Sequence, residues 1–137
     1  MSTPRGIRNC NPLNIERTAT QWQGMRPKQT DKRFCQFISM EYGYRAAFKT
    51  LFTYAKKHNL HTIREWITRW APPSENDTAA YIRVVCTRAR LDSNVPISIC
   101  DAEKMTAVVA AMAYMENGIE AVMEEVVSGF EMAFVYG

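Results

Sequence analysis

The sequence predicts a mainly α (α+β) protein: one domain, residues 1–137, that is mostly helical and has a small β-lobe near its N-terminus. Two observations support this fold class. From residue 41 onward, apolar residues recur at helical spacing in segments that capping residues, glycines and prolines divide. Before residue 41 there is no helical period, and turn-forming residues are frequent. A chain of 137 residues, 47% of them hydrophobic, is long enough to bury one core.

The β-lobe is predicted from the segment RFCQFIS, residues 33–39. It alternates Phe and Cys with polar residues and is rich in residues that favour strands. We expect this strand to pair with NIERT, residues 14–18, and with the segment around QWQGM, residues 21–25, in a small sheet. The segment PKQTDK, residues 27–32, would then form the hairpin turn.

Two helices are predicted in the middle of the chain. The first begins at Glu41, has apolar residues at i, i+4, i+7, i+8 and i+11 from Tyr44, and ends at residues 58–60. The second opens with the capping box Thr62-x-x-Glu65 and ends where two prolines follow residue 71. Its two tryptophans, Trp66 and Trp70, are expected in the core.

Three further helices are predicted toward the C-terminus. The segment 74–91 begins with Ser, Asn and Asp, which are favourable N-caps. A second capping box, Ser98-x-x-Asp101, precedes a long helix that Asn117-Gly118 ends. A last helix covers residues 119–128, with Gly129 at its end, and residues 130–137 pack back as a further turn.

Glu116 is an unusual residue within this pattern. At about 100° per residue, it shares one helix face with Met105, Val109 and Met112. A carboxylate on a face that points into the core is costly unless it is paired or lies in a cleft. Two interpretations follow: a helix-end Glu that reaches solvent, or an acid whose pKa is raised by its apolar surroundings.

The charge distribution is uneven. The net charge is +3, yet 16 of the 17 Lys and Arg residues fall in residues 1–90, and only Lys104 opposes the acids of residues 101–137. Such a chain suits an anionic polymer, either nucleic acid or an acidic cell-wall glycan. The alternative is an ordinary solvated basic surface.

Other features exclude several classes of protein. The four cysteines form no C-x-x-C pair, which argues against zinc and favours free thiols, although a Cys10–Cys35 bridge stays open. No metal or cofactor motif is present. No apolar run reaches the roughly 20 residues of a membrane span, and no signal peptide precedes the domain. We therefore expect synthesis in a cytoplasm and delivery by another component.

Several motifs resemble a module of phage virion-associated muramidases and related prophage proteins. In order along the chain, they are RGIRNCNPLNIE, QWQG, RFCQFIS, EYGYRAAFKTL, WAPPSENDTAAYIRVV and the late ENG. Together they cover roughly residues 5–130. The chain departs from the family pattern at Cys10, where Asn is usual, and at Leu13, where Gly is usual, so the substrate contacts of this loop are in doubt.

The chain also resembles lysozyme-like glycosidases of the flagellar glucosaminidase and soluble lytic transglycosylase kinds, with its elements in a different order. In those families a helix ending in a catalytic Glu comes first, and the asparagine- or glutamine-bearing loop follows. Here the loop at residues 11–15 comes first, and the apolar helix ending in Glu lies at residues 101–117. The resemblance therefore implies a circularly permuted lysozyme-like fold, which is permissible when the termini lie close together.

This resemblance implies cleavage of the β-1,4 bond between N-acetylmuramic acid and N-acetylglucosamine in peptidoglycan. Glu116 corresponds to the catalytic acid, and Tyr81 to the tyrosine near it. Asp31 lies in the β-lobe, where flagellar-type relatives have a second acid, although a plain turn residue is the alternative. Glu41 and Glu75 are further candidates for the second carboxylate or for the cleft wall. If none acts, one Glu serves as acid and then base, as in transglycosylases.

Three more residues are candidates for substrate binding. Asn11 and Asn14 offer amides to sugar groups, although Asn-rich turns also arise for backbone reasons. Trp22 is a candidate for stacking on a sugar ring, with core packing as the alternative.

Two rival functions remain open. The first is an inactive virion structural or cell-wall-binding protein with the same fold. The second is a helical nucleic-acid-binding protein, which the arginine-rich first two thirds suggest but which has no helix-turn-helix pattern. Peptidoglycan glycan strands, and other virion proteins, are the expected partners.

Overall fold

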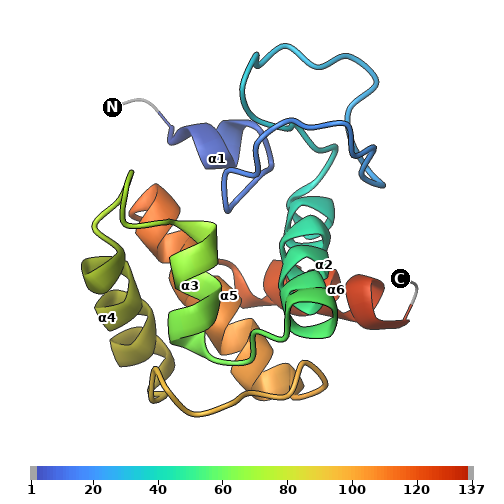
Figure 1. The fold of residues 1–137 in the computed structure, drawn as a ribbon. Helices are drawn as coiled ribbons and strands as arrows, with labels where there is room; N and C mark the ends of the chain where they lie inside the picture. Colours follow the sequence, from blue (N-terminus) through green and yellow to red (C-terminus); the bar gives the residue numbers. More distant parts are fainter. Residues whose placement is uncertain (1–2, 136–137) are drawn as a thin grey trace.

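The computed structural model describes residues 3–135 and confirms the mainly α class. Its helices are α1 (Arg5–Arg8), α2 (Met40–His58), α3 (Ile63–Trp70), α4 (Thr78–Ala89), α5 (Ala102–Asn117) and α6 (Met123–Val135) (Figure 1). Helices α2 to α6 form a helical body, and residues 3–39 lie across one end of it. None of the helices within the described range is long and apolar enough to cross a membrane.

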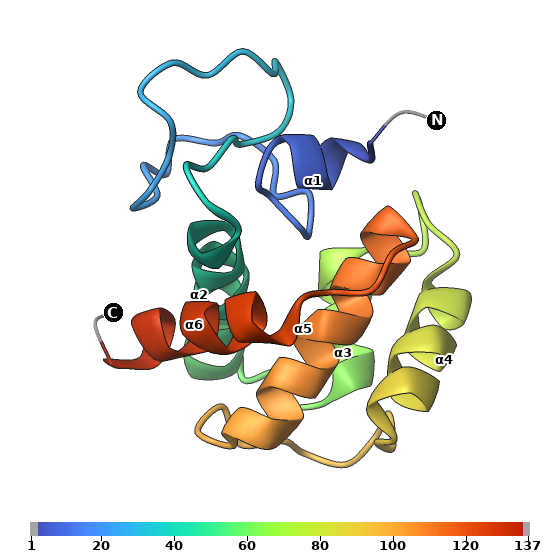
Figure 2. The ribbon, with the colours of Figure 1, turned by 180° about the vertical axis from the view of Figure 1, so that it is seen from behind.

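The core of the helical body is built from the apolar faces of its helices. Helix α6 crosses α2, and α5 packs against both α4 and α6 (Figure 2). Tyr44 and Phe48 from α2, Trp66 from α3, and Met105 and Val108 from α5 are all at most 1% exposed. Each such side chain stabilises the fold by roughly 1.5–3 kcal/mol relative to an exposed one.

The helix boundaries follow the local capping chemistry in most places. The capping box of Thr62 and Glu65 is present at the start of α3, as predicted. The side chain of Asp77 caps α4, and Gly118 ends α5 with a left-handed φ of 72°. The second predicted capping box is wrong, because Asp101 itself is the N-cap of α5. Ser98 instead accepts a hydrogen bond from the backbone N–H of Cys100, in the turn before the helix.

The prediction that Gly129 ends the last helix is also wrong, since α6 continues through it to Val135. Gly129 lies where α6 crosses α2, and a Cβ there would be 2.4 Å from the Cβ of Tyr44. The glycine therefore permits close helix packing rather than a left-handed cap. Sequence analysis also missed α1, a single turn within a region expected to have no helix.

The predicted strand at residues 33–39 is wrong, although its pairing partners were correctly predicted. Two isolated antiparallel bridges, Glu16 with Phe34 and Met25 with Phe37, replace a ladder, and the described residues contain no regular strand. Only some backbone donors of this segment bond to other backbone groups: the N–H of Cys35 donates to the carbonyl of Ile15, whereas Asp31 accepts from the N–H groups of Arg33 and Phe34. Such side-chain bonds compete with sheet formation.

The cysteines are unpaired. All four thiols are free, so the open question of a Cys10–Cys35 bridge is answered against it. Cys35 is buried in a small second cluster with Phe37 and Ala46, under the N-terminal segment.

Candidate functional site

Glu116 lies in the last turn of α5, at the end of a buried face. Met105, Val109 and Met112, which share that face, are all fully buried. The Glu116 side chain itself is half-buried, because the helix ends one residue later and the face opens there. The sequence pattern thus correctly placed one carboxylate at the edge of the core.

Two residues from distant parts of the chain hold this carboxylate. The side-chain amide of Asn14 donates to Glu116 Oε1 at 2.9 Å, and the hydroxyl of Tyr81 donates to Oε2 at 3.0 Å. Asn14 has a left-handed φ of 54°, a conformation that Asn tolerates better than most residues. Tyr81 is in the first turns of α4 and only 5% exposed. Asn14 and Tyr81, which lie 102 and 35 positions before Glu116 in the sequence, therefore meet at its carboxylate.

Burial and hydrogen bonding change the pKa of Glu116 in opposite directions. Burial raises the pKa of Glu116, whereas the hydrogen bonds from Asn14 and Tyr81 lower it, and the net change is upward. Burial, with the nearby charge of Glu116, raises the pKa of Tyr81 well above its usual value. Tyr81 therefore remains a neutral donor at any physiological pH.

Asn14 also carries an unused acceptor. Its Oδ1 is buried and makes no hydrogen bond to the described protein atoms. A buried amide oxygen without a donor is costly, and functional sites often retain such groups. If the amide rotated, Oδ1 would face a protonated Glu116 and accept a hydrogen bond from it. Asn14 can therefore form a hydrogen bond with either protonation state of Glu116.

Asn117 fixes the end of α5 against the turn that carries Asn14. Its amide donates to the carbonyl of Pro12 at 2.8 Å and to that of Ala113 at 3.0 Å. Leu13, in the same turn, is 1% exposed and has an ordinary negative φ, so it anchors the turn in the core without backbone strain. The left-handed positions of this segment are Asn14 and Cys10, the latter with a φ of 49°.

Glu116 faces a cleft of about 640 Å³ between the N-terminal segment and the helical body. One side is formed by residues 13–16, 18, 33 and 34, and the other by α2, the end of α3 and the following loop. The residues that line it are Leu13, Asn14, Ile15, Glu16, Thr18, Arg33, Phe34, Thr50, Tyr54, Trp70, Ala71, Pro72, Glu75, Asn76 and Glu116. A cleft of this volume lies within the range of ligand sites.

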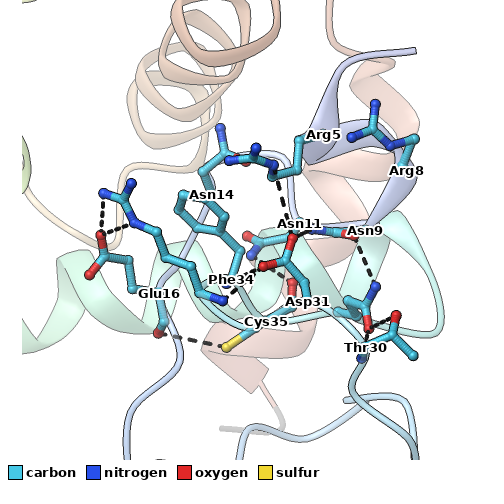
Figure 3. Close-up of polar contacts among 12 residues, drawn as sticks. Arg5, Arg8, Asn9, Asn11, Asn14, Glu16, Thr30, Asp31, Phe34 and Cys35 are labelled. Atoms are coloured by element: carbon cyan, nitrogen blue, oxygen red, sulfur yellow. Dashed lines mark hydrogen bonds and ion pairs between the residues drawn. The ribbon is translucent and has the colours of Figure 1, made fainter. Parts of the chain in front are cut away.

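Asp31 does not line this cleft. Its Oδ1 accepts the N–H groups of Arg33 and Phe34 at 2.8 and 2.9 Å, and its Oδ2 accepts from Asn9 at 3.1 Å (Figure 3). Arg5 lies 4.0 Å away. These backbone hydrogen bonds, followed by Asn9 and Arg5, lower the pKa of Asp31 to about 2. The carboxylate thus closes the N-terminal turn.

Of the other predicted residues, one lines the cleft and the rest lie outside its lining. Glu75 lines the cleft together with Asn14, although its side chain is exposed. Asn11 is completely buried and bonds the backbone of Ile15 and Cys35.

Trp22 and Glu41 also lie outside the cleft lining. Trp22 packs against the cluster of Cys35 and Phe37. Glu41 lies in the first turn of α2, where its charge adds to the effect of burial in raising the pKa of Glu125.

Sequence analysis missed several residues that line the cleft. Glu16 and Arg33 form an ion pair at 2.8 Å, and Arg33 also lies over the ring of Phe34. Tyr54 and Trp70 are only partly buried, so Trp70 packs against the core, as predicted, and also lines the cleft. The position of Trp70, two residues before the Pro72-Pro73 break, was a usable signal for a ring at a helix end.

These features define a mainly helical protein in which a half-buried carboxylate, an amide and a phenol meet at a cleft. The chain belongs to the family of Protein P5 of Pseudoalteromonas phage PM2. The two are 39% identical over 137 residues, which cover 97% of this chain and 83% of the relative. A phage protein is therefore a member of this family. No protein-family model matches the sequence.

Proposed function

We propose that this protein is a peptidoglycan-cleaving glycosidase with a circularly permuted lysozyme-like fold. Its substrate would be the β-1,4 bond between N-acetylmuramic acid and N-acetylglucosamine. The observation that carries the proposal is the position of Glu116, which lines the cleft and contacts both Asn14 and Tyr81. A phage relative agrees with a wall-degrading role during phage entry or release, in which other virion proteins would deliver the enzyme.

Glu116 would act as the general acid. Cleavage of a glycosidic bond requires a proton on the leaving oxygen, and an ordinary Glu is mostly ionised at neutral pH. Burial favours the protonated form of Glu116. As the C–O bond breaks, the proton moves to the leaving oxygen and the electron pair remains there. The new carboxylate would then be stabilised by the two donors, Asn14 and Tyr81.

The second step has two possible routes. In a hydrolase, a second carboxylate stabilises the sugar cation or activates water. Besides Glu116, the carboxylates that line the cleft are Glu16 and Glu75, whereas Asp31 is held elsewhere. In a transglycosylase, Glu116 would instead take the proton of the substrate's own hydroxyl group as that oxygen attacks the anomeric carbon. The structure favours Glu16 or Glu75 over Asp31 if a second acid is used.

The walls of the cleft also offer side chains that are suited to binding sugars. Tyr54 and Trp70 line it on the helical side, and aromatic rings bind the apolar faces of sugars. Arg33, Asn76 and Thr18 add polar groups for hydroxyl and amide recognition.

A zymogram on purified cell-wall material tests the proposal directly. The wild type should clear the wall and Glu116→Gln should not, while Glu103→Gln, an exposed Glu at the other end of α5, should clear it as the wild type does. Equal clearing by Glu116→Gln would refute the role of Glu116. Wild-type binding to sacculi without released fragments would instead favour a non-catalytic, wall-binding virion protein.

Mass spectrometry of the released fragments distinguishes the two routes. Reducing ends indicate hydrolysis, and anhydro ends indicate transglycosylation. If Glu16 or Glu75 is the second carboxylate, changing that residue to Gln should abolish hydrolysis and changing the other should not. In the transglycosylase route, neither Glu16→Gln nor Glu75→Gln should change the activity.

A further inference from the structure

The N-terminal segment, residues 3–39, concentrates positive charge on one wall of the cleft. It contains seven Lys and Arg residues and two acids, whereas residues 40–137 contain ten Lys and Arg residues and twelve acids. Six of the seven basic side chains in the segment are exposed. The segment lies across one end of the helical body and forms one side of the cleft that Glu116 lines. A ligand in that cleft would therefore meet a basic wall on one side.

Arg33 is the single basic residue among the described residues that line this cleft. Its Nε and Nη2 donate to Glu16 Oε1 at 3.0 and 2.8 Å, and its guanidinium carbon lies 4.8 Å from the centre of the Phe34 ring. These two contacts orient the guanidinium. Its Nη1 forms no hydrogen bond to the part of the chain that the structure describes, and the side chain is 70% exposed. Arg33 therefore has donors left for a ligand.

Arg5 adds a second guanidinium over the same ring. Its guanidinium carbon lies 5.1 Å from the centre of the Phe34 ring, and its Nε lies 4.0 Å from Asp31 Oδ2 (Figure 3). Its two Nη atoms form no hydrogen bond within residues 3–135, and its side chain is 53% exposed. Because Arg5 and Arg33 share one ring, their guanidinium carbons are less than about 10 Å apart. We call these two residues the arginine pair.

The arginine pair lies near the carboxylate of Glu116. Asn14 donates to Glu116, and Glu16, which accepts from Arg33, follows Asn14 by two residues. Two residues of extended chain span at most about 7 Å. On the opposite wall, the charged residue that lines the cleft is the acid Glu75. A substrate bound at Glu116 would therefore have any carboxylate of its own attracted to the N-terminal wall and repelled by the other.

We propose that the arginine pair binds the carboxylates of the acidic peptide that peptidoglycan carries on its muramic acid residues. This inference rests on the proposed function and extends it, because the peptide becomes part of the recognised substrate together with the glycan. A guanidinium binds a carboxylate through two parallel N–H···O bonds, and two guanidiniums this close can hold two carboxylates of one peptide. The protein would then prefer peptide-bearing strands to bare glycan strands.

The test compares two soluble substrates. One is uncross-linked peptidoglycan strands with their peptides, and the other is the same strands after an amidase has removed the peptides. The measured quantity is the ratio of kcat/KM for the peptide-bearing strands to kcat/KM for the bare strands, which cancels any general loss of activity in a variant. For the wild type, this ratio should be at least about 10, as expected for hydrogen bonds between charged groups.

Substitution of the arginines tests which residues produce this preference. Arg5→Gln and Arg33→Gln should each lower the ratio, and the double variant should bring it to about 1, through a higher KM for the peptide-bearing strands. Lys28→Gln is the matched control, because it removes the same charge from an exposed residue of the same segment outside the cleft lining. It should keep the wild-type ratio. A wild-type ratio near 1, or a ratio that falls as far in Lys28→Gln as in Arg33→Gln, would overturn the proposal.

Binding measurements separate this inference from the proposed function. If the wild type cleaves neither substrate, the glycosidase proposal fails, and isothermal titration calorimetry with the same two kinds of strand decides the inference. Tighter binding of peptide-bearing strands that depends on the arginine pair would support it, and equal dissociation constants would overturn it. A DNA duplex is the third probe. Tighter binding of DNA than of peptide-bearing strands, lost in the double variant, would assign the arginine pair to nucleic acid instead.

Discussion

Asp31 and Glu116 are two hydrogen-bonded carboxylates whose pKa values move in opposite directions. Asp31 accepts two backbone N–H groups and the amide of Asn9, and its pKa falls to about 2. Glu116 accepts one amide and one hydroxyl, yet its pKa rises, because burial outweighs both hydrogen bonds. The number of donors alone does not decide the direction of the pKa shift. The cost of removing the carboxylate from water decides it at Glu116.

This difference also separates structural from chemical use of an acid. A carboxylate with a low pKa remains charged and holds a turn, as Asp31 does, but it has no proton to donate. A carboxylate held near protonation can donate one, provided that a cleft gives it access to a substrate. Of the two, only Glu116 lines a cleft.

The largest expected effect is on catalysis by Glu116→Gln. Removal of the proton donor should reduce the rate of wall degradation at least about 100-fold, the usual contribution of a general acid. The measurement is turbidity loss of purified sacculi, with Glu103→Gln as the control. Asp31→Asn should retain most of the wild-type rate wherever it is folded, and a larger loss for Asp31→Asn than for Glu116→Gln would reverse the comparison.

Tyr81→Phe should have the next largest effect. The variant removes one hydrogen bond to the charged form of Glu116, so we expect the rate to fall roughly 10- to 100-fold. Because that bond lowers the pKa of Glu116, its loss should move the alkaline limb of the pH–rate profile to higher pH. Tyr114→Phe, on α5 but outside the cleft lining, is the matched control. An unchanged limb would show that Tyr81 does not act on the carboxylate.

Asp31→Asn should act on stability instead. We expect the free energy of unfolding at pH 7 to fall by about 1–3 kcal/mol, since a charged acceptor of several hydrogen bonds is lost. A lowered folded-state pKa stabilises the protein above pH 3.8 and loses this effect as the pH falls toward about 2. The difference between wild type and variant should therefore vanish near pH 2 in urea unfolding. Asp92→Asn, an exposed acid that accepts one backbone N–H, should cost less at pH 7.

Much of the helical body was predictable because its signals are local. The stripe from Tyr44, the box of Thr62 and Glu65, and Gly118 as a cap each depend on neighbours a few positions away. Gly129 was not predictable, because its role depends on Tyr44, a residue of another helix.

The candidate site was predictable only in part for the same reason. Helical spacing identified Glu116 as a carboxylate on a core face, and the resemblance identified Tyr81. The contact of Asn14 with Glu116 spans 102 positions and has no local signal. Asp31 and the predicted strand are linked, because the side chain of Asp31 binds the N–H groups of Arg33 and Phe34 at the start of that segment. Trp22 packs against the cluster of Cys35, its stated alternative, and Trp70 packs against the core but also lines the cleft, because exposure depends on where the cleft opens, which a single sequence does not specify.

The smallest expected effect sharpens the comparison most directly. Glu116→Gln should raise the free energy of unfolding at pH 7 by about 1 kcal/mol, because a neutral amide costs less to bury than a charge. A raised folded-state pKa favours the fold at low pH and loses this contribution as the pH rises through that pKa. The gain in stability should therefore be absent near pH 4 and present at pH 8. Asp31→Asn should have an effect of the opposite sign, a loss of stability that is present at pH 7 and vanishes near pH 2. Urea unfolding at both pH values measures it, and a Glu116→Gln variant less stable than the wild type at pH 8 would mean that hydrogen bonding, rather than burial, dominates at this carboxylate.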